Sequence, residues 1–438
     1  MRQIGGPVDP ADTECPAPAG AVAGADGVAG GVIGAGVATD GEGGVVRPPS
    51  APARLPRRAT VSSLALFVLL GAATASLGAA LPAIRVLYPA GASSGGRLVS
   101  LYMLGALIAI TVGGLGERKL PPAKAIMSLI GFFAAGCLGI GLAPNWTFLQ
   151  ITAVAAGAGF GGLALYINTA FVQASDGRNL VMLNFINAAY SAGAVAGPVL
   201  TGLSAHLGVR LLFPVCGVLA IACLPARGCS HALARRASAP VATGRSQPGL
   251  AMLKIMVPFA AIGFLYDGLE TGTGAWQSTH LVWIGYSVTA AAQIAACFWA
   301  GLLVGRLVIP PLTTRISASV IAFGGMLVSS TAISAASLHW LAPYGYALAG
   351  FGLAPVFPAM LAMTSRTAAS PQFANGVMLS ACMVGGVFWP VIIGLFAEPG
   401  MPATIPFALA AIGGLCLVAI WNSVRVTGVG GGQEISHS

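Results

Sequence analysis

The chain has 438 residues, of which 56% are hydrophobic and only 8% are charged, and its mean hydropathy is +0.85. Soluble domains carry about 25% charged residues, so this composition excludes a soluble protein and indicates a polytopic membrane protein. The net charge of +9 does not indicate nucleic-acid binding, because the basic residues lie at the ends of apolar segments, as membrane topology requires.

The first segment, 1–59, is rich in Gly, Ala, Val and Pro. Its weakly apolar part is interrupted by Asp26 and lacks the basic start and leucine-rich core of a signal peptide. Such a stretch buries too little apolar surface to fold or to span a bilayer. We therefore expect a disordered cytoplasmic arm.

Twelve apolar segments follow, each with about the 20 residues that a membrane-spanning helix needs. They cover 61–83, 96–116, 123–143, 147–173, 179–203, 208–225, 253–282, 289–310, 317–337, 341–365, 373–396 and 403–424. The fold class predicted from this pattern is all-α, with twelve transmembrane helices.

The basic residues predict how these spans are oriented. With twelve spans, Arg85, Arg97 and Arg210 fall on one side of the membrane, and the remaining 18 of the 21 Lys and Arg fall on the other. Cytoplasmic loops carry the excess of positive charge. Both termini are therefore predicted to be cytoplasmic.

A hydrophilic stretch with several arginines, 227–250, divides the spans six and six. We interpret it as a basic cytoplasmic linker between two six-helix bundles, which cover 60–226 and 251–426. The last residues, 427–438, form a predicted cytoplasmic tail.

Two acidic residues, Asp267 and Glu270, lie inside the seventh apolar segment. A separation of three residues places both on one helix face, about one turn apart. Each ionised acid at the centre of a spanning helix costs on the order of 3 kcal/mol on insertion scales. No Lys or Arg occurs in the core of this segment, so we expect the pair to bind a proton or another cation and to titrate as a coupled unit.

The same helix face carries further polar and small residues, and it should line a cavity because lipid would not tolerate it. Its members are Asp267, Glu270, Thr271, Gly274 and Ser278. The run 271–274, Thr-Gly-Thr-Gly, weakens the helix, and interrupted helices commonly line transport sites. The alternative is a carboxylate pair that neighbouring hydroxyls satisfy and that contributes only to packing.

The segment 113–124 reads GGLGERKLPPAK, with Glu117 and Arg118 at its centre, and Gly305-Arg306 recurs after the eighth span. These loops resemble the signature of the major facilitator superfamily, although Leu120 and Pro121 replace its usual glycine and basic residue. The resemblance implies two six-helix bundles that rock about a central site, with Glu117, Arg118 and Arg306 in conformational-switch loops.

Within that superfamily, the segments 266–276 and 298–306 are similar to the branch of fucose and glucose symporters. That branch has coupling carboxylates in spans one and four, and this chain has no Asp or Glu in either span. Proton or cation coupling is therefore assigned to span seven, first to Glu270 and then to Asp267.

Substrate contacts are predicted from amides and aromatic rings inside the spans, since amides hydrogen-bond polar solutes and rings stack on them. The candidates are Thr271, Asn168, Asn187, Gln293, Trp299 and Asn375. Bonding between helices is the alternative role for each. The glycine-proline element 193–198 is typical either of helix packing or of antiporters.

The function predicted from the sequence is secondary transport of a small solute across a bacterial inner membrane by alternating access, coupled to protons through the carboxylates of the seventh span. The resemblance favours a sugar-like polar solute.

 The first alternative is a proton-driven exporter of drugs or secondary metabolites, and the second is a membrane-embedded enzyme or sensor. The sequence contains no pattern for catalytic residues, a metal site or a cofactor. The expected partners are the lipid bilayer, a small-molecule substrate and a proton or other cation, and no nucleic acid.

Overall fold

The computed structural model describes residues 55–88, 91, 94–115, 120–174, 181–203, 209–237, 250–312, 316–367 and 371–427. Nearly all of the predicted arm, Glu117 and Arg118, most of the linker and the tail lie outside these residues. Within them the chain is almost entirely helical and contains no strand. The all-α prediction is therefore confirmed.

The first half of the chain forms seven helices, of which α2 follows α1 after a break at Ala80. They are α1 (Arg57–Ala79), α2 (Leu81–Leu87), α3 (Ser94–Leu115), α4 (Pro122–Leu142), α5 (Trp146–Ala174), α6 (Val181–Leu203) and α7 (Val209–Ala222). A 3-10 turn (Leu224–Cys229) and the short helix α8 (Ser230–Ala237) follow. The part of the predicted linker that the structure describes is thus helical.

The second half repeats this pattern, with one broken span formed by α12 and α13. Its helices are α9 (Leu250–Trp283), α10 (Val288–Leu312), α11 (Ala318–Ala335), α12 (Ala342–Leu353), α13 (Val356–Thr367), α14 (Pro371–Phe396) and α15 (Thr404–Thr427). Each predicted span coincides with one of these helices, or with a broken pair, to within a few residues. Periodicity and hydropathy therefore located the spans well.

Among the described residues, nine helices are long and apolar enough to cross a membrane, and a bent pair around Cys223 could add a tenth. The count of twelve spans is consistent with this result and stays a prediction. Large apolar side chains remain on the outside, for example Val112, Ile151 and Val418. Polar ones such as Asp267 and Gln277 are buried, as expected for a protein whose outer surface faces lipid.

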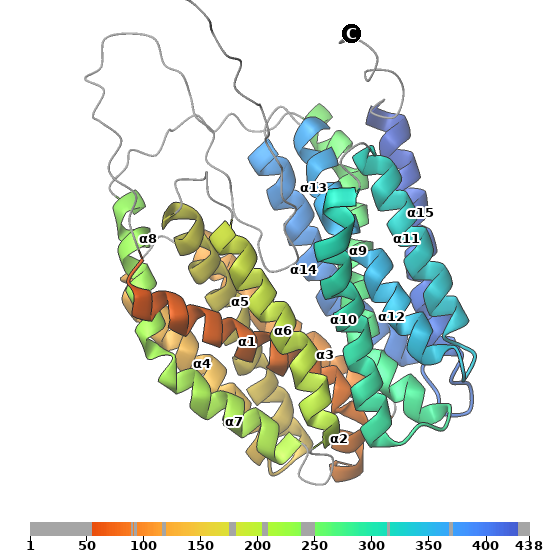
Figure 1. Ribbon diagram of the computed structural model, residues 1–438, viewed down its shortest axis with the longest axis horizontal. Coiled ribbons are helices and arrows are strands. Elements are labelled where there is room, and N and C mark those ends of the chain that lie inside the picture. The colour runs from red at the N-terminus through yellow and green to blue at the C-terminus, as the bar shows by residue number, and fades with distance from the viewer. Residues whose placement is uncertain are drawn as a thin grey trace, which may run out of the picture.

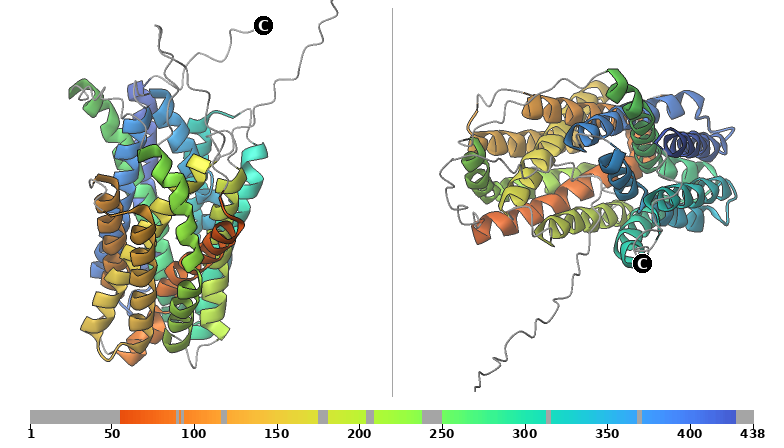
Figure 2. Two further views of the ribbon diagram at one scale, coloured as in Figure 1. Left: turned by 90° about the vertical axis from the view of Figure 1, so that its left-hand side faces the viewer. Right: turned by 90° about the horizontal axis from the view of Figure 1, so that it is seen from above.

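The helices gather into two bundles that stand side by side, α1 to α7 in one and α9 to α15 in the other (Figure 1). The same division is visible from above (Figure 2). The bundles contact each other mainly through α6 with α10, α3 with α14 and α1 with α9, and less extensively through α1 with α10, α2 with α9 and α3 with α9. A site between the halves is therefore expected to be lined chiefly by these helices.

The predicted interruption of the seventh span is wrong. Helix α9 is continuous over 34 residues, through the Thr-Gly-Thr-Gly run. Its glycines are used for packing: a Cβ at Gly272 would touch Ile393 and Leu409, and one at Gly274 would touch Trp299. The close neighbours that these glycines admit offset the helix-weakening effect of glycine, which is about 1 kcal/mol per residue.

The two bundles approach closely at the end where α2 lies. A Cβ at Gly78 in α1 would overlap the carbonyl oxygen of Gly274 in α9, and one at Gly96 in α3 would overlap the carbonyl oxygen of Pro390 in α14. Gly202, near the end of α6, lies in the same way against Gln293 of α10. Backbones can approach this closely only where a side chain is missing, so this end is closed by direct helix contact.

Arg85 of α2 strengthens the contact between the bundles at this end. Its guanidinium lies 5.3 Å from the ring centre of Trp276 and 5.7 Å from that of Trp283, both in α9. It also donates a hydrogen bond to the Thr279 hydroxyl at 3.3 Å. A planar cation between two indole rings gains from cation–π attraction to both.

Replacing Gly78 with valine should open this closed end, because the new side chain would overlap the backbone of Gly274 and force α1 away from α9. We expect faster hydrogen–deuterium exchange in α2 and in the last two turns of α9. Gly131→Val is the matched control, since a Cβ at Gly131 meets nothing within 4 Å. Equal exchange in the two variants would contradict the closed-end assignment.

Candidate functional site

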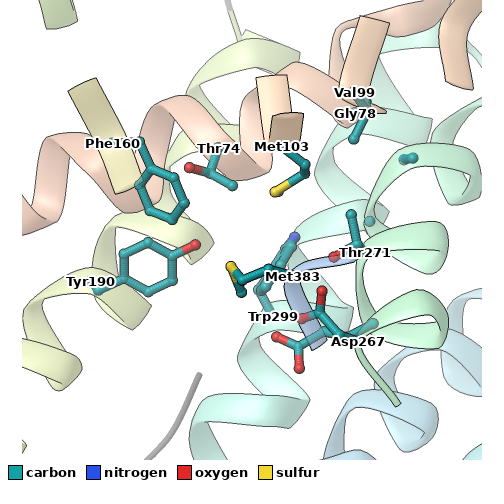
Figure 3. Close-up of a pocket in the computed structure, with 13 residues that line it drawn as sticks. Thr74, Gly78, Val99, Met103, Phe160, Tyr190, Asp267, Thr271, Trp299 and Met383 are labelled. Atoms are coloured by element: carbon teal, nitrogen blue, oxygen red, sulfur yellow. The ribbon is translucent and has the colours of Figure 1, made fainter. Parts of the chain in front are cut away.

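A cavity of about 60 Å³ lies between the two bundles, large enough for a few water molecules. Helices α1, α3, α5 and α6 of the first bundle and α9, α10 and α14 of the second contribute to its wall. The lining residues are Thr74, Gly78, Val99, Met103, Phe160, Tyr190, Asp267, Glu270, Thr271, Gly274, Ala275, Trp299 and Met383. Figure 3 shows Phe160 and Tyr190 facing Asp267 and Trp299 across this space.

Asp267 lies on the α9 wall of the cavity and is only 3% exposed. Its carboxyl packs against Gly386 of α14, where a Cβ would collide with Oδ2, and it interacts with the hydroxyl of Thr271 one turn away. Among the described residues, no basic side chain comes within 4 Å of this carboxyl. Asp267 therefore has polar neighbours but no charge partner within the described part of the chain.

Glu270, one turn further along α9, is 5% exposed and has a different environment. Its Oε2 accepts a hydrogen bond of 2.6 Å from the hydroxyl of Tyr266. Its Oε1 lies 3.9 Å from Nη2 of Arg306, the one ion pair that the described part of the chain contains. A positive charge at this distance offsets the negative charge of Glu270, so the two acids are not equivalent.

The position of Arg306 corrects its predicted placement in a loop. The residue lies inside α10, six positions before the end of that helix, and turns toward α9 rather than toward the membrane surface. Its Nε and Nη2 are buried without a hydrogen-bond partner among the described residues. A charge in this position is stabilised by the opposite charge of Glu270, which explains why it can lie within the span.

The cavity contains four of the predicted site residues, Asp267, Glu270, Thr271 and Trp299. The four predicted amides do not line it. Asn168 is buried within the first bundle, Gln293 packs against Gly202 of α6, and Asn375 is hydrogen-bonded to Ser365 at 3.1 Å. Asn187 lies in α6, one turn before Tyr190, and is likewise absent from the wall.

Sequence reasoning missed the part of the wall that the first bundle provides. Phe160 and Tyr190 lie 6.1 Å apart between ring centres, and Met103 and Met383 lie beside them (Figure 3). Thr74 bonds to the hydroxyl of Tyr102 at 2.9 Å. Apolar and aromatic residues in a span give no signal that separates a cavity wall from a packed core, so only the helix arrangement shows this.

The fold and the cavity define a polytopic membrane protein in which two helical bundles enclose a central site. Residues 63–390 match the family model described as Major Facilitator Superfamily. This match covers most of the chain, which therefore belongs to that superfamily of transporters. Membership supports the prediction of a transporter over that of an enzyme or sensor.

Solved structures of transporters have the same fold at low sequence identity. The nucleoside transporter NupG is 14% identical, with a TM-score of 0.66, and the match covers 84% of this chain and 98% of that one. PepTSo2 is 14% identical, with a TM-score of 0.63 and coverage of 85% and 98%. A bacterial homologue of the human lysosomal transporter Spinster, inward-facing and occupied, is 14% identical, with a TM-score of 0.59 and coverage of 84% and 96%. No curated protein matches the chain.

We expect Gly386→Ala to lower the thermal unfolding midpoint, because the added methyl group would occupy the space of the Asp267 carboxyl. Gly376→Ala in the same helix has no neighbour within 4 Å. It should leave the midpoint unchanged or raise it, since alanine favours a helix over glycine by about 0.5–1 kcal/mol. Equal shifts in the two variants would show that Gly386 does not make room for Asp267.

The ion pair of Glu270 with Arg306 can be tested by a double-mutant cycle. Glu270→Gln and Arg306→Gln each leave one buried charge without its partner and should destabilise the protein. The double variant should recover part of this loss, with a coupling of about 1–3 kcal/mol, as for residues in contact. SDS-induced unfolding of the purified proteins measures the stability of the wild type and of the three variants. Strictly additive losses of stability would rule out the ion pair.

Proposed function

We propose that this chain is a secondary transporter, which moves a small solute by alternating access and couples it to a proton or another cation at Asp267. The observation that carries the proposal is a buried carboxyl on the wall of a cavity between two bundles, for which the described part of the chain supplies no charge partner. An ionised carboxylate in such a place is costly unless a cation neutralises it. Binding and release of that cation can therefore follow the movement of the bundles.

The geometry supports Asp267 rather than Glu270, which the sequence favoured, as the coupling group. Glu270 already has the charge of Arg306 and the hydrogen bond from Tyr266. A cation arriving at Glu270 would have to displace Arg306, which has no other acid to pair with among the described residues. Asp267 can accept a cation without breaking an existing ion pair.

The closed end near α2 supports a conformation that opens to the opposite side. Among the described residues, the close glycine contacts between the bundles, at Gly78, Gly96 and Gly202, lie at the α2 end. With both termini cytoplasmic, as the distribution of basic residues predicts, this end faces outward and the described state is inward-facing. We place the protein in a bacterial inner membrane on the same grounds of composition and charge.

Proton coupling can be tested with the full chain in liposomes that contain a pH-sensitive dye. A panel of glucose, fucose, uridine and tetraphenylphosphonium should include at least one solute that drives a proton flux. Asp267→Asn should abolish that flux, because the amide cannot exchange a proton. Glu398→Gln makes the same chemical change at an exposed residue outside the cavity and should leave the flux unchanged.

Two outcomes would overturn the proposal. One is a wild-type protein that moves a solute at the same rate with and without a pH gradient or other cation gradient. The other is an Asp267→Asn variant that keeps the full solute-driven proton flux. The thermal unfolding midpoint of each variant verifies beforehand that the variant is folded. Asp267→Glu, which keeps the carboxyl, should retain part of the flux.

A further inference from the structure

We infer that the solute taken by this cavity is a lipophilic organic cation with a single positive charge, which binds at Asp267 in place of the proton. This inference names the substrate class of the proposed transport site and rests on that proposed function. It replaces the sugar-like solute that the sequence resemblance favoured, and it is based on the charges and on the chemical character of the cavity wall.

The charge balance of the cavity favours a monocation. The Arg306 charge offsets that of Glu270, and Asp267 is left with no basic side chain within 4 Å among the described residues. The wall therefore carries one uncompensated negative charge when Asp267 is ionised. An anionic solute would be repelled, and a dication would leave one positive charge without a partner in a site of low polarity.

The wall of the cavity suits an apolar body. Three aromatic residues, Phe160, Tyr190 and Trp299, line it together with the thioethers of Met103 and Met383. Aromatic faces attract organic cations, most strongly where water is excluded. Figure 3 shows the rings of Phe160 and Tyr190 on the side opposite Asp267, so a cation could contact the rings and the carboxyl together.

The same wall offers little to a polyhydroxylated solute. The predicted amides Asn168, Gln293 and Asn375 lie elsewhere. Of the hydroxyls that do line the cavity, that of Thr74 is bonded to the Leu70 carbonyl at 2.8 Å and to Tyr102. A sugar would lose its hydrogen bonds to water without regaining enough of them here, and each unpaired polar group costs about 1–3 kcal/mol.

The flexible residues of the wall explain how a bulky cation fits. At about 60 Å³ the cavity holds water molecules only. Met103 and Met383 project into it from opposite bundles, and methionine changes its rotamer at little cost because its side chain is unbranched. Movement of these two side chains, together with rocking of the bundles, would enlarge the space between the rings and Asp267.

Proton and cation would compete for Asp267, and the titratable groups around it set the conditions of that competition. These are Tyr266 and Glu270 in α9, Tyr190 in α6, Cys382 in α14 and Arg306 in α10. Glu270 is paired with Arg306, so Asp267 is the acid left to exchange a proton for the solute.

The test measures binding of radiolabelled tetraphenylphosphonium to the purified full chain in detergent. We expect saturable binding that weakens as the pH falls. Asp267→Asn should weaken binding at least tenfold and remove its pH dependence, whereas Glu398→Gln should bind like the wild type. Asp267→Glu should restore most of the affinity, and Trp299→Leu should weaken binding at unchanged pH dependence. Triphenylphosphine oxide, a neutral molecule of similar shape, should not compete.

The inference is overturned if the neutral oxide competes as well as the cation, if Asp267→Asn binds the cation normally, or if no saturable cation binding occurs. Its failure is distinguishable from that of coupled transport. A neutral solute that drives an Asp267-dependent proton flux would refute the inferred cationic substrate class and would leave the proposed function intact. Cation binding at Asp267 without any coupled flux would keep the binding site and refute that function.

Discussion

The cost of placing a carboxylate within the membrane interior determines how the parts of this protein are arranged. Lipid cannot stabilise the charge of Asp267 or Glu270, so α9 must turn these residues toward the other helices. The structure places both on the wall between the bundles, with Arg306 of α10 opposite Glu270. A single polar stripe thus fixes the rotation of α9 and brings α10 next to it.

The close helix contact at the α2 end adjoins the cavity, since Gly78 takes part in the contact and also lines the cavity. Where Gly78, Gly96 and Gly202 lie, the backbones of the two bundles touch. At the level of Phe160, Tyr190 and Trp299, large side chains keep the helices apart and leave a space. The size of the residues along each helix therefore decides which level is closed, and Arg85 between two indole rings adds an electrostatic contact at the closed level.

The sequence predicted local features well and pairwise features poorly. Hydropathy is a local property, and it located the helices to within a few residues. The helix period likewise predicted that Asp267, Glu270 and Thr271 share one face, and all three line the cavity. The amides could not be assigned in this way, because their periodicity does not show which neighbouring helix they meet. Asn375, for example, is satisfied by Ser365 at the end of α13.

The counter-charge of Glu270 was missed for the same reason. The sequence pattern that predicted an unpaired acid is confined to α9, whereas Arg306 comes from the next span. Helix α9 also stayed intact although its Thr-Gly-Thr-Gly run predicted a break, because Trp299, Ile393 and Leu409 pack onto its glycines. In both cases the stabilising contacts come from residues far away in the sequence. A single sequence does not show which distant residues will meet.

The pairing of Glu270 limits what the site can do. If Arg306 holds the charge of Glu270 constant, the cavity changes its charge by one unit when Asp267 binds a cation. A proton and a cationic solute then exclude each other at this carboxyl, since both neutralise the same charge. In the proposed exchange, the solute leaves when the proton binds, and the bundles rearrange with the charge neutralised in either case. Under the proposed exchange, Glu270 and Arg306 keep the transfer at one charge per cycle.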